Sequence, residues 1–237
     1  MCGRYVMSKA TGDLVSAFNV DEAAGPEVNP SWNVAPTQRV RLVADRINHE
    51  TGEMGRRLET VRWGLVPSWA KDPKMGGRMI NARMETITEK PSFRTAASKR
   101  RALVPADGYY EWQKHEDGTK TPTYLHPERD ELLAFAGLFE FWPDPSLPDG
   151  HEDKWLVTCT IITTTATDTL GHIHDRTPLI VPADLQRSWL DPTLTGKDEV
   201  RELLDSIPAP SLVPRIVGDE VGPVRNDGPH LIEPVSA

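Results

Sequence analysis

From residue 132 to residue 141 the sequence reads Leu132-Leu133-Ala134-Phe135-Ala136-Gly137-Leu138-Phe139-Glu140-Phe141, a nearly uninterrupted apolar run. A second long run, Trp155 to Thr165, is rich in β-branched residues. Runs of this composition, bounded by turn residues, are typical of strands. The segment between them, Trp142 to Lys154, is acidic and contains three prolines, which is typical of a loop. The sequence therefore predicts two long strands separated by an acidic loop.

Shorter strand and helix signals lie on both sides of these runs. Further strands are expected at Val40 to Ile47, Gly55 to Trp63, Ala102 to Pro105 and Gly108 to Lys114, the first two joined by a polar turn at residues 48–52. Helices are expected at Thr11 to Phe18, Arg83 to Lys90 with a further turn through Lys99, Ala183 to Leu190 and Lys197 to Ile207. The strands do not alternate regularly with helices, which disfavours a Rossmann fold. We therefore predict an α+β fold: a single domain over residues 1–237, built round an antiparallel, barrel-like sheet with flanking helices.

The composition excludes several classes of protein. The chain has 237 residues, of which 38% are hydrophobic, and its 21 prolines are about twice the usual share. No stretch approaches the roughly 18 consecutive apolar residues of a membrane span, and the first residues lack the apolar segment of a secretory signal. Cys2 and Cys159 form no CxxC pair, so neither a cysteine-rich zinc site nor a disulfide framework is expected. We expect a reduced, cytoplasmic protein that binds neither a membrane nor a metal.

The charge is distributed unevenly along the chain. The net charge of −8 by itself argues against a nucleic-acid partner. Residues 54–115, however, carry 13 Lys and Arg against 6 Asp and Glu, an excess that suits a local phosphate-binding face. A solvated charged surface accounts for this excess equally well. The acidic loop is expected to weaken the affinity for DNA.

Cys2 is the sharpest chemical feature of the sequence. A small second residue permits removal of Met1, which leaves an α-amine and a thiol on one residue. The amine of such a 1,2-aminothiol condenses with an aldehyde to an imine, and the thiolate then closes a five-membered thiazolidine ring. The unperturbed pKa values, about 8 for the amine and about 8.5 for the thiol, leave both groups partly reactive at neutral pH. A cysteine at this position is also often inert, so Cys2 alone decides nothing.

Two other functions start from the same residues. Met1-Cys2-Gly3 also opens the N-terminal-nucleophile glutamine amidotransferases, in which the cysteine attacks an amide and its own α-amine acts as base. That class usually continues with an Arg-Gly-Pro or Arg-Asp segment and carries an Asn-Gly segment, whereas this chain has Arg4-Tyr5 and no Asn-Gly. A non-enzymatic reader of modified bases in DNA is a further alternative, and it leaves Cys2 without a task.

Seven motifs in a fixed order carry a more specific signal. They are Cys2 to Tyr5, Trp32 to Thr37, Arg62 to Trp69, Ile80 to Thr86, Pro105 to Trp112, His174 to Pro178 and Val224 to Pro229. Together they resemble the SOS-response-associated peptidase family, whose members process abasic sites in single-stranded DNA. The resemblance extends from Cys2 to about Glu233, which is nearly the whole chain.

The resemblance implies both an activity and a set of site residues. It implies an abasic-site crosslinking enzyme in which Cys2, after removal of Met1, forms a thiazolidine with the ring-opened deoxyribose. Asn81, Glu111 and His174 carry over as the other catalytic residues. The family name adds a second activity, a thiol peptidase that removes its own Met1. The implied partner is single-stranded DNA containing abasic sites, with no cofactor, and we expect a monomer that joins the nucleoid after DNA damage.

Each of these residues also has a local chemical argument. Glu111 stands among aromatic residues, where desolvation raises a carboxyl pKa and makes the group a proton shuttle. His174 titrates near neutrality and can move the proton that opens the sugar ring. Asn81 offers a donor and an acceptor to a sugar hydroxyl or an imine. His172 and His174 lack a third nearby ligand, so a zinc site is not expected.

Polar DNA contacts are expected from five further residues. Arg4, Arg83 and Arg176 lie inside the motifs and are expected to bind flanking phosphates. Asn33 lies in the second motif and is assigned to the same DNA-binding set. Thr163 lies near the end of a strand-like run and can bind the sugar or a phosphate through its hydroxyl.

Three tryptophans complete the expected DNA-binding set. Trp63, Trp69 and Trp112 offer flat faces on which exposed bases can stack. A core position is an equally weighted alternative for Trp63 and Trp69. Cys159, by contrast, is expected to be a small buried residue.

Overall fold

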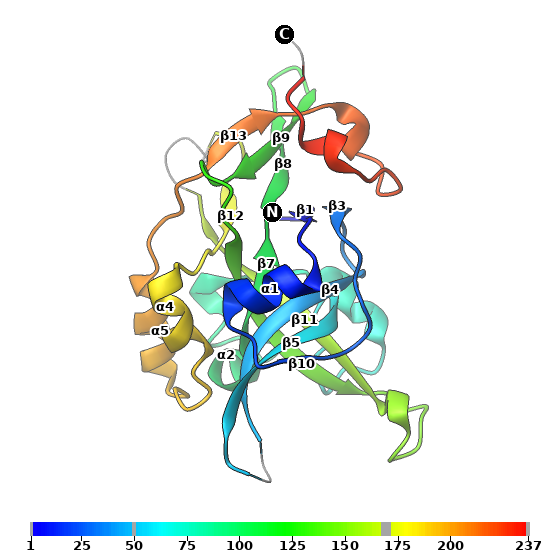
Figure 1. Cartoon of the computed structure of the whole chain (residues 1–237), viewed down its shortest axis with the longest axis vertical. Helices are drawn as coiled ribbons and strands as arrows, with labels where there is room; N and C mark the ends of the chain where they lie inside the picture. The colour runs from blue at the N-terminus through cyan, green and yellow to red at the C-terminus, as the bar shows by residue number, and fades with distance from the viewer. Residues whose placement is uncertain (1, 49–50, 167–171, 236–237) are drawn as a thin grey trace.

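Two β-sheets and a few helices make up the structure, a computed structural model that describes residues 2–48, 51–166 and 172–235. The larger sheet fills the lower part of Figure 1 and the smaller sheet the upper part. Met1 and part of the turn predicted at 48–52 lie outside the described residues. Within the described ranges, no helix is both long and apolar enough to cross a membrane.

The larger sheet closes into a barrel. Its ring consists of β4 (Arg39–Ile47), β5 (Met54–Trp63), β7 (Arg101–Ala106), β10 (Leu133–Pro143) and β11 (Trp155–Thr165). Neighbouring strands of the ring are antiparallel, except that β11 and β5 pair in parallel and close it. The predicted barrel-like sheet is confirmed, with the correction that the barrel is mixed and not purely antiparallel.

Three short strands pair with strands of the barrel. β2 (Glu22–Ala23) runs beside β5, while β6 (Asn81–Arg83) and β12 (Arg176–Pro178) flank the last part of β11. Thr163 of β11 is in register with Arg83 on one side and with Pro178 on the other. This pairing brings together two motifs that lie far apart in the sequence.

The smaller sheet grows directly out of the barrel. Its order is β13 (Val213–Ile216), β9 (Lys120–His126), β8 (Gly108–Lys114), β1 (Tyr5–Met7) and β3 (Ser31–Val34), with antiparallel neighbours. Only Asp107 separates β7 from β8, so one stretch of chain serves both sheets. Gly108 stands at this junction because a Cβ there would lie 2.6 Å from the carbonyl oxygen of Leu125.

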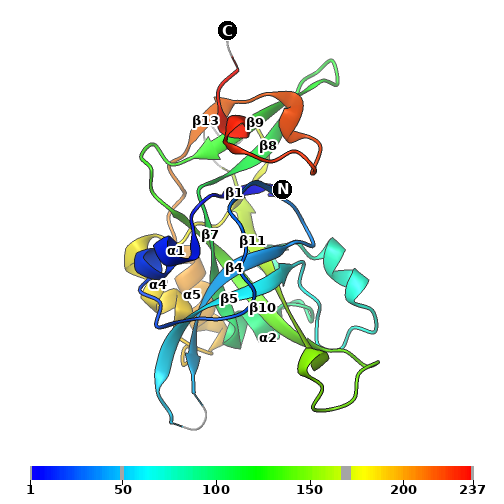
Figure 2. The same ribbon diagram turned by 45° about the vertical axis from the view of Figure 1, so that its right-hand side comes forward.

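Helices cover the outside of the barrel. α1 (Thr11–Phe18) crosses in front of it, and α4 (Ala183–Leu190) and α5 (Lys197–Ser206) lie together at its left in Figure 1. Figure 2 shows α1, α4 and α5 on the same side of the barrel after the turn. α2 (Arg94–Lys99) leads into β7. Short 3-10 helices in the described residues are η1 (Pro73–Arg78), η2 (Met84–Thr86), η3 (Glu152–Lys154), η4 (Asp219–Val221) and η5 (Pro229–Ile232).

The barrel strand β7 is buried along its whole length. Its outer face meets α4, where the Trp189 Nε1 donates to the carbonyl oxygen of Ala102 at 2.8 Å. The buried Arg101 Nε donates to the carbonyl oxygen of Trp189 at 2.8 Å. Because both faces of the strand are covered, its sequence after Arg101 is a continuous apolar run without polar alternation.

Most predicted elements are confirmed. α1, β8, β11 and α4 have the predicted bounds. The helix predicted at Arg83 to Lys90 is wrong, since that segment contains the end of β6, the single turn η2 and further turns. The strands β1, β3, β9 and β13 are absent from the prediction. β1 and β3 are only 3 and 4 residues long, and the smaller sheet pairs segments from distant parts of the chain, so local patterns mark them poorly.

Candidate active site

Strand β8 presents chemically different side chains on its two faces. Tyr109 packs in the main hydrophobic core, whereas Tyr110 belongs to a separate apolar cluster on the opposite face. Because side chains alternate along a strand, Glu111 lies on the same face as Tyr109. The main core on that face includes Cys2. Glu111 therefore extends from the smaller sheet toward the N-terminal segment.

Cys2 is fully buried beside this face. It lies just before β1, which pairs with β8 through Tyr5 and Tyr109. Burial raises the pKa of the Cys2 thiol well above its ordinary value, and the negative charge of Glu111 acts in the same direction. The thiol is thus held in its protonated form at neutral pH. Its proton must pass to another group before or while the sulfur attacks.

Asn81 connects the barrel to the N-terminal segment. Its Nδ2 donates to the carbonyl oxygen of Cys2 at 2.8 Å. β6 holds Asn81 in register with Ile161 of β11, and the Trp63 Nε1 fixes the preceding residue by donating to the carbonyl oxygen of Ile80 at 2.9 Å. The Asn81 Oδ1 is buried and has no hydrogen-bond partner among the described residues. This acceptor atom is available to a ligand next to Cys2.

Glu111 is a buried carboxyl group, with 4% of its surface exposed. Burial raises the pKa of Glu111, and the charge of His174 acts in the opposite direction. A carboxyl group with a raised pKa exchanges protons at a pH closer to neutrality than an exposed one does. Glu111 therefore has the properties that the sequence analysis expected of a proton shuttle.

His174 lies at the rim of the site, with 31% of its side chain exposed. Its Nδ1 accepts a hydrogen bond from the backbone N–H of Arg176 at 3.0 Å. The same Nδ1 lies 2.7 Å from the Asp175 Oδ1. An acceptor Nδ1 places the proton of the neutral ring on Nε2, whereas a protonated ring can donate from Nδ1 to Asp175.

Two further residues, Tyr109 and Thr177, join the two sheets at the site. The Tyr109 hydroxyl and the Thr177 Oγ1 are 2.9 Å apart, and both residues are buried. Burial raises the pKa of Tyr109, and the charges of Cys2 and Glu111 raise it further. Because Thr177 lies in β12 and Tyr109 in β8, the contact fixes the His174 segment relative to Glu111. Both residues lie inside the sequence motifs, but their motif positions indicate no chemical role.

Arg4 and Asn33 are tied to the C-terminal segment. The Arg4 Nη1 donates to the Asn33 Oδ1 at 2.7 Å, and its Nη2 donates to the carbonyl oxygen of Gly222 at 2.9 Å. The Asn33 Nδ2 lies 3.2 Å from the carbonyl oxygens of Val221 and Pro223 and 2.8 Å from that of Asn226. Asn33 is 2% exposed, and these contacts join β3 to the C-terminal segment.

Two more side chains of the expected DNA-binding set are fully buried. Trp63 and Thr163 are each 0% exposed. Trp63 takes the core position that was its alternative, where its ring packs edge-on against Tyr5 with centroids 5.3 Å apart. A motif shows that a residue is constrained, but not whether a ligand or the core constrains it.

The remaining expected DNA contacts differ in their surroundings. Arg176 binds both carboxylate oxygens of Glu85, from Nη1 at 2.6 Å and from Nη2 at 2.9 Å. This pairing lowers the pKa of Glu85. Arg83 is exposed, and 58% of the surface of Trp69 is exposed. Trp112 is partly buried, and the Arg4 guanidinium lies 5.9 Å from the centre of one of its rings.

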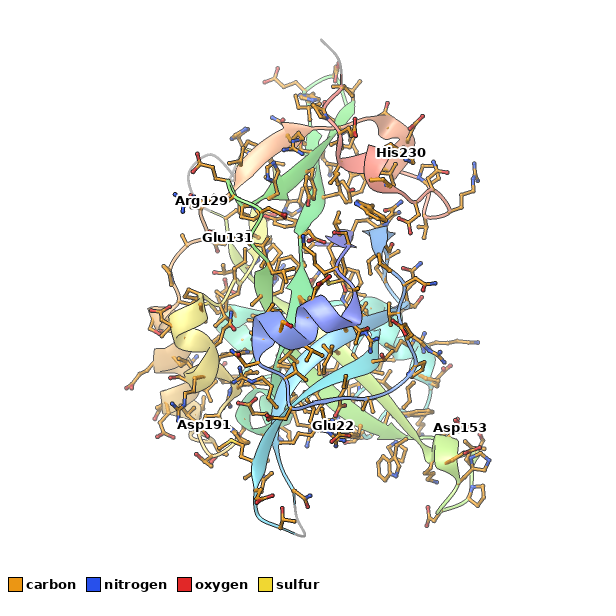
Figure 3. The ribbon with its side chains drawn as sticks, in the orientation of Figure 1. Glu22, Arg129, Glu131, Asp153, Asp191 and His230 are labelled. Atoms are coloured by element: carbon orange, nitrogen blue, oxygen red, sulfur yellow. The ribbon has the colours of Figure 1, made fainter. Side chains whose placement is uncertain are left out.

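The acidic loop lies away from the site. Asp153 marks this loop at the lower right of Figure 3, at the opposite end of the barrel from the smaller sheet. Dissolved salt therefore screens the electrostatic effect of the loop on the site. Within the described ranges, no three His, Cys, Asp or Glu side chains come together as ligands for a metal ion.

The comparisons with known proteins agree with the motif order. A family profile described as "SOS response associated peptidase (SRAP)" matches residues 1–224. The chain belongs to the SRAP family. Cys2, Asn81, Glu111 and His174 all lie inside the residues that the family profile matches.

Individual SRAP relatives cover the whole chain. Abasic site processing protein YoqW of Bacillus subtilis (strain 168) is 39% identical over 235 residues, which are 98% of this chain and 99% of YoqW. Abasic site processing protein YedK of Escherichia coli (strain K12) is 31% identical over 241 residues, covering 99% of this chain and 100% of YedK. A crystal structure of a protein from Bacteroides thetaiotaomicron is similar in fold, with a TM-score of 0.78 at 23% identity, covering 99% of this chain and 100% of that one.

Proposed function

We propose that this chain captures abasic sites in single-stranded DNA by forming a covalent thiazolidine between Cys2 and the ring-opened deoxyribose. The grouping of Cys2, Asn81 and Glu111 where the two sheets meet carries the proposal. The names of YoqW and YedK as abasic site processing proteins support this class of substrate. Both sheets contribute side chains, so the chain would act as one domain over residues 1–237. The reaction requires no second copy, which is consistent with a monomer acting on DNA in the cytoplasm and nucleoid.

The proposed reaction begins with removal of Met1, which frees the α-amine of Cys2. The amine adds to the C1′ aldehyde of the opened sugar, and loss of one water gives an imine. The Cys2 sulfur then adds to the imine carbon, and the thiol proton passes to the nitrogen. Water is the other product of the condensation, so the balance calls for no oxidant, reductant or cofactor.

Each site residue has one task in this sequence of steps. Glu111 takes a proton from the α-ammonium and returns it to the hydroxyl that leaves as water. His174 moves a proton from the C1′ hydroxyl to O4′, which opens the closed sugar. Asn81 holds the Cys2 carbonyl through Nδ2 and offers its partnerless Oδ1 to the substrate.

Purified protein is expected to begin at Cys2, because a thiazolidine needs a free α-amine on the residue that carries the thiol. Intact mass spectrometry should show the loss of one methionine. A preparation that retains Met1 completely and still forms a heat-stable adduct with abasic DNA would contradict the mechanism.

The family description as a peptidase supports a second proposal, that the Cys2 thiol itself removes Met1. The Cys2→Ser variant separates this from removal by a cellular aminopeptidase, because serine is also small enough for that enzyme. Complete loss of Met1 from the Cys2→Ser variant would exclude a need for the thiol. Retention of Met1 would support self-processing.

The two alternative functions predict different products. A non-enzymatic reader of modified DNA binds abasic oligonucleotides but leaves no adduct on a denaturing gel. An amidohydrolase releases ammonia from glutamine and has no preference for abasic DNA. A heat-stable adduct formed only with abasic DNA is the result that the proposed function requires.

The Arg83→Ala variant is expected to bind single-stranded DNA more weakly and to flatten the dependence of log K on log salt by about 0.7, the value for one lost phosphate contact. Arg83 is exposed on β6, two residues after Asn81, so both side chains lie on the same side of that strand. Fluorescence anisotropy over a series of salt concentrations measures this slope.

Lys197→Ala and Arg201→Ala are the matched controls for Arg83. Both residues lie on α5 and pair with Glu89 at the surface. Their substitution should change neither the affinity nor the slope. If the Arg83 variant and the two α5 variants change the affinity and the slope equally, β6 is not part of the DNA-binding surface.

A further inference from the structure

Thr123 of β9 is a buried residue with an unused hydroxyl. Its surface is 2% exposed, and its Oγ1 has no hydrogen-bond partner among the described residues. Burying a hydroxyl without a partner destabilises a fold. Valine has nearly the same shape and lacks this penalty, so a threonine here calls for a functional reason.

Thr123 lies directly across from Glu111 in the smaller sheet. The neighbouring pair Tyr109 and Leu125 packs into the main core with Cys2, and the pair between them packs into the other cluster. Glu111 and Thr123 therefore share the face that looks toward Cys2. Side chains directly opposite each other in an antiparallel sheet have Cβ atoms roughly 4.5–5.5 Å apart, which is within reach of a hydrogen bond between their ends.

We propose that Thr123 is a positioning residue for Glu111: the two side chains are not hydrogen-bonded to each other in the structure, but they lie directly opposite, and a side-chain rotation lets the Thr123 hydroxyl donate to the ionised Glu111 carboxylate and hold it toward the α-amine of Cys2. This inference rests on the proposed function, because it assumes that the ionised carboxylate is the form that takes up the proton. The hydroxyl carries no charge, so it stabilises the carboxylate without competing for the proton that the reaction moves.

Several other groups face Glu111 and influence its ionisation. They are the Cys2 thiol, the Tyr109 phenol, the His174 imidazole and the Asp175 carboxylate, together with the α-amine that Cys2 carries after processing. None of these groups lies on β9. Because burial opposes ionisation of Glu111, a neutral donor on β9 favours the ionised form. Removing that donor should therefore shift the titration of Glu111 to higher pH.

The test compares Thr123→Val with Thr123→Ser, which restores the hydroxyl. Thr160→Val is the matched control, since Thr160 in β11 is also fully buried with a partnerless Oγ1. The rate of adduct formation with abasic single-stranded DNA is measured from pH 4 to pH 8. In the Thr123→Val variant the acidic midpoint is expected to rise by about 0.5–1 pH unit, with a three- to tenfold slower rate below the midpoint. The Thr123→Ser variant and the Thr160→Val variant should follow the unmodified protein.

A purely structural role for Thr123 would lower the rate equally at every pH and leave the midpoint in place, and that result overturns the inference. A Thr123→Ser variant with the same pH profile as Thr123→Val also overturns the inference. The methyl group, and not the hydroxyl, would then determine the rate of adduct formation. A carbon-13 NMR titration of the Glu111 carboxyl in DNA-free protein provides a second readout. If the unmodified protein forms no adduct at all, the proposed function fails, while an unshifted NMR titration in Thr123→Val refutes the inference separately.

Discussion

The Cys2→Ala variant is expected to form no heat-stable adduct with abasic single-stranded DNA. Once Met1 is removed, this variant keeps an α-amine, so the first condensation to an imine remains possible. It lacks the sulfur that closes the thiazolidine ring, so the reaction stops at a reversible imine. Borohydride should trap this imine, and strand cleavage by β-elimination should accompany it. The measurement is a denaturing gel of labelled oligonucleotide, run with and without heating and with and without borohydride.

The Cys2→Ser variant tests whether the sulfur itself is needed. Its hydroxyl has a similar size but forms a far less stable ring, so it should behave like the Cys2→Ala variant. Cys159→Ala is a matched control, because Cys159 is also fully buried in the main core and has no task in the proposed reaction. A heat-stable adduct from the Cys2→Ala variant at the level of the unmodified protein would exclude the thiazolidine.

His174→Ala should slow adduct formation on closed-ring abasic DNA by roughly 10²–10⁴-fold, the usual contribution of a positioned acid–base group. An abasic sugar is mostly a closed hemiacetal, and only its open aldehyde reacts with the amine of Cys2. His174 holds Nδ1 against the backbone N–H of Arg176, which leaves Nε2 to handle the proton that opens the ring. The same proton path operates in reverse, so reversal of a preformed crosslink should slow as well.

A small aldehyde separates the task of His174 from that of Glu111. Such an aldehyde has no ring to open, so its condensation with Cys2 should be nearly unaffected by His174→Ala. Glu111→Ala should slow both reactions, because the carboxylate serves the amine and the imine. If His174→Ala slows the small aldehyde as much as the abasic DNA, ring opening is not the task of His174. Stopped-flow rates for both substrates and both variants decide the assignment.

The site was predicted more fully from the sequence than its DNA contacts were. The motif order pointed to Cys2, Asn81 and Glu111, and the structure places these residues together at the junction of the sheets. The same motifs pointed to Asn33 and Trp63 as DNA contacts, but both are buried. Conformational constraint and ligand binding leave the same signal in a short motif. The depth at which each of these side chains lies depends on the whole fold.

Local patterns by themselves determined the long strands and the principal helices. The bounds of β8 and β11 match the expected strands, and those of α1 and α4 match the expected helices. These are properties of neighbouring residues, since a strand or helix signal repeats within a few positions. The 1,2-aminothiol that removal of Met1 would create also follows from the sequence, because the amine and the thiol then belong to one residue.

Only the tertiary structure decided how these pieces meet. Parallel pairing of β11 with β5 closes the barrel, and β6 joins β11 across a separation of 80 residues, at Ile161 and Asn81. The placement of Thr123 opposite Glu111 depends on the register of β8 and β9. A shift of that register by one residue would move Thr123 to the other face of the sheet. Register results from the combined packing of distant segments, so no local pattern in the sequence specifies it.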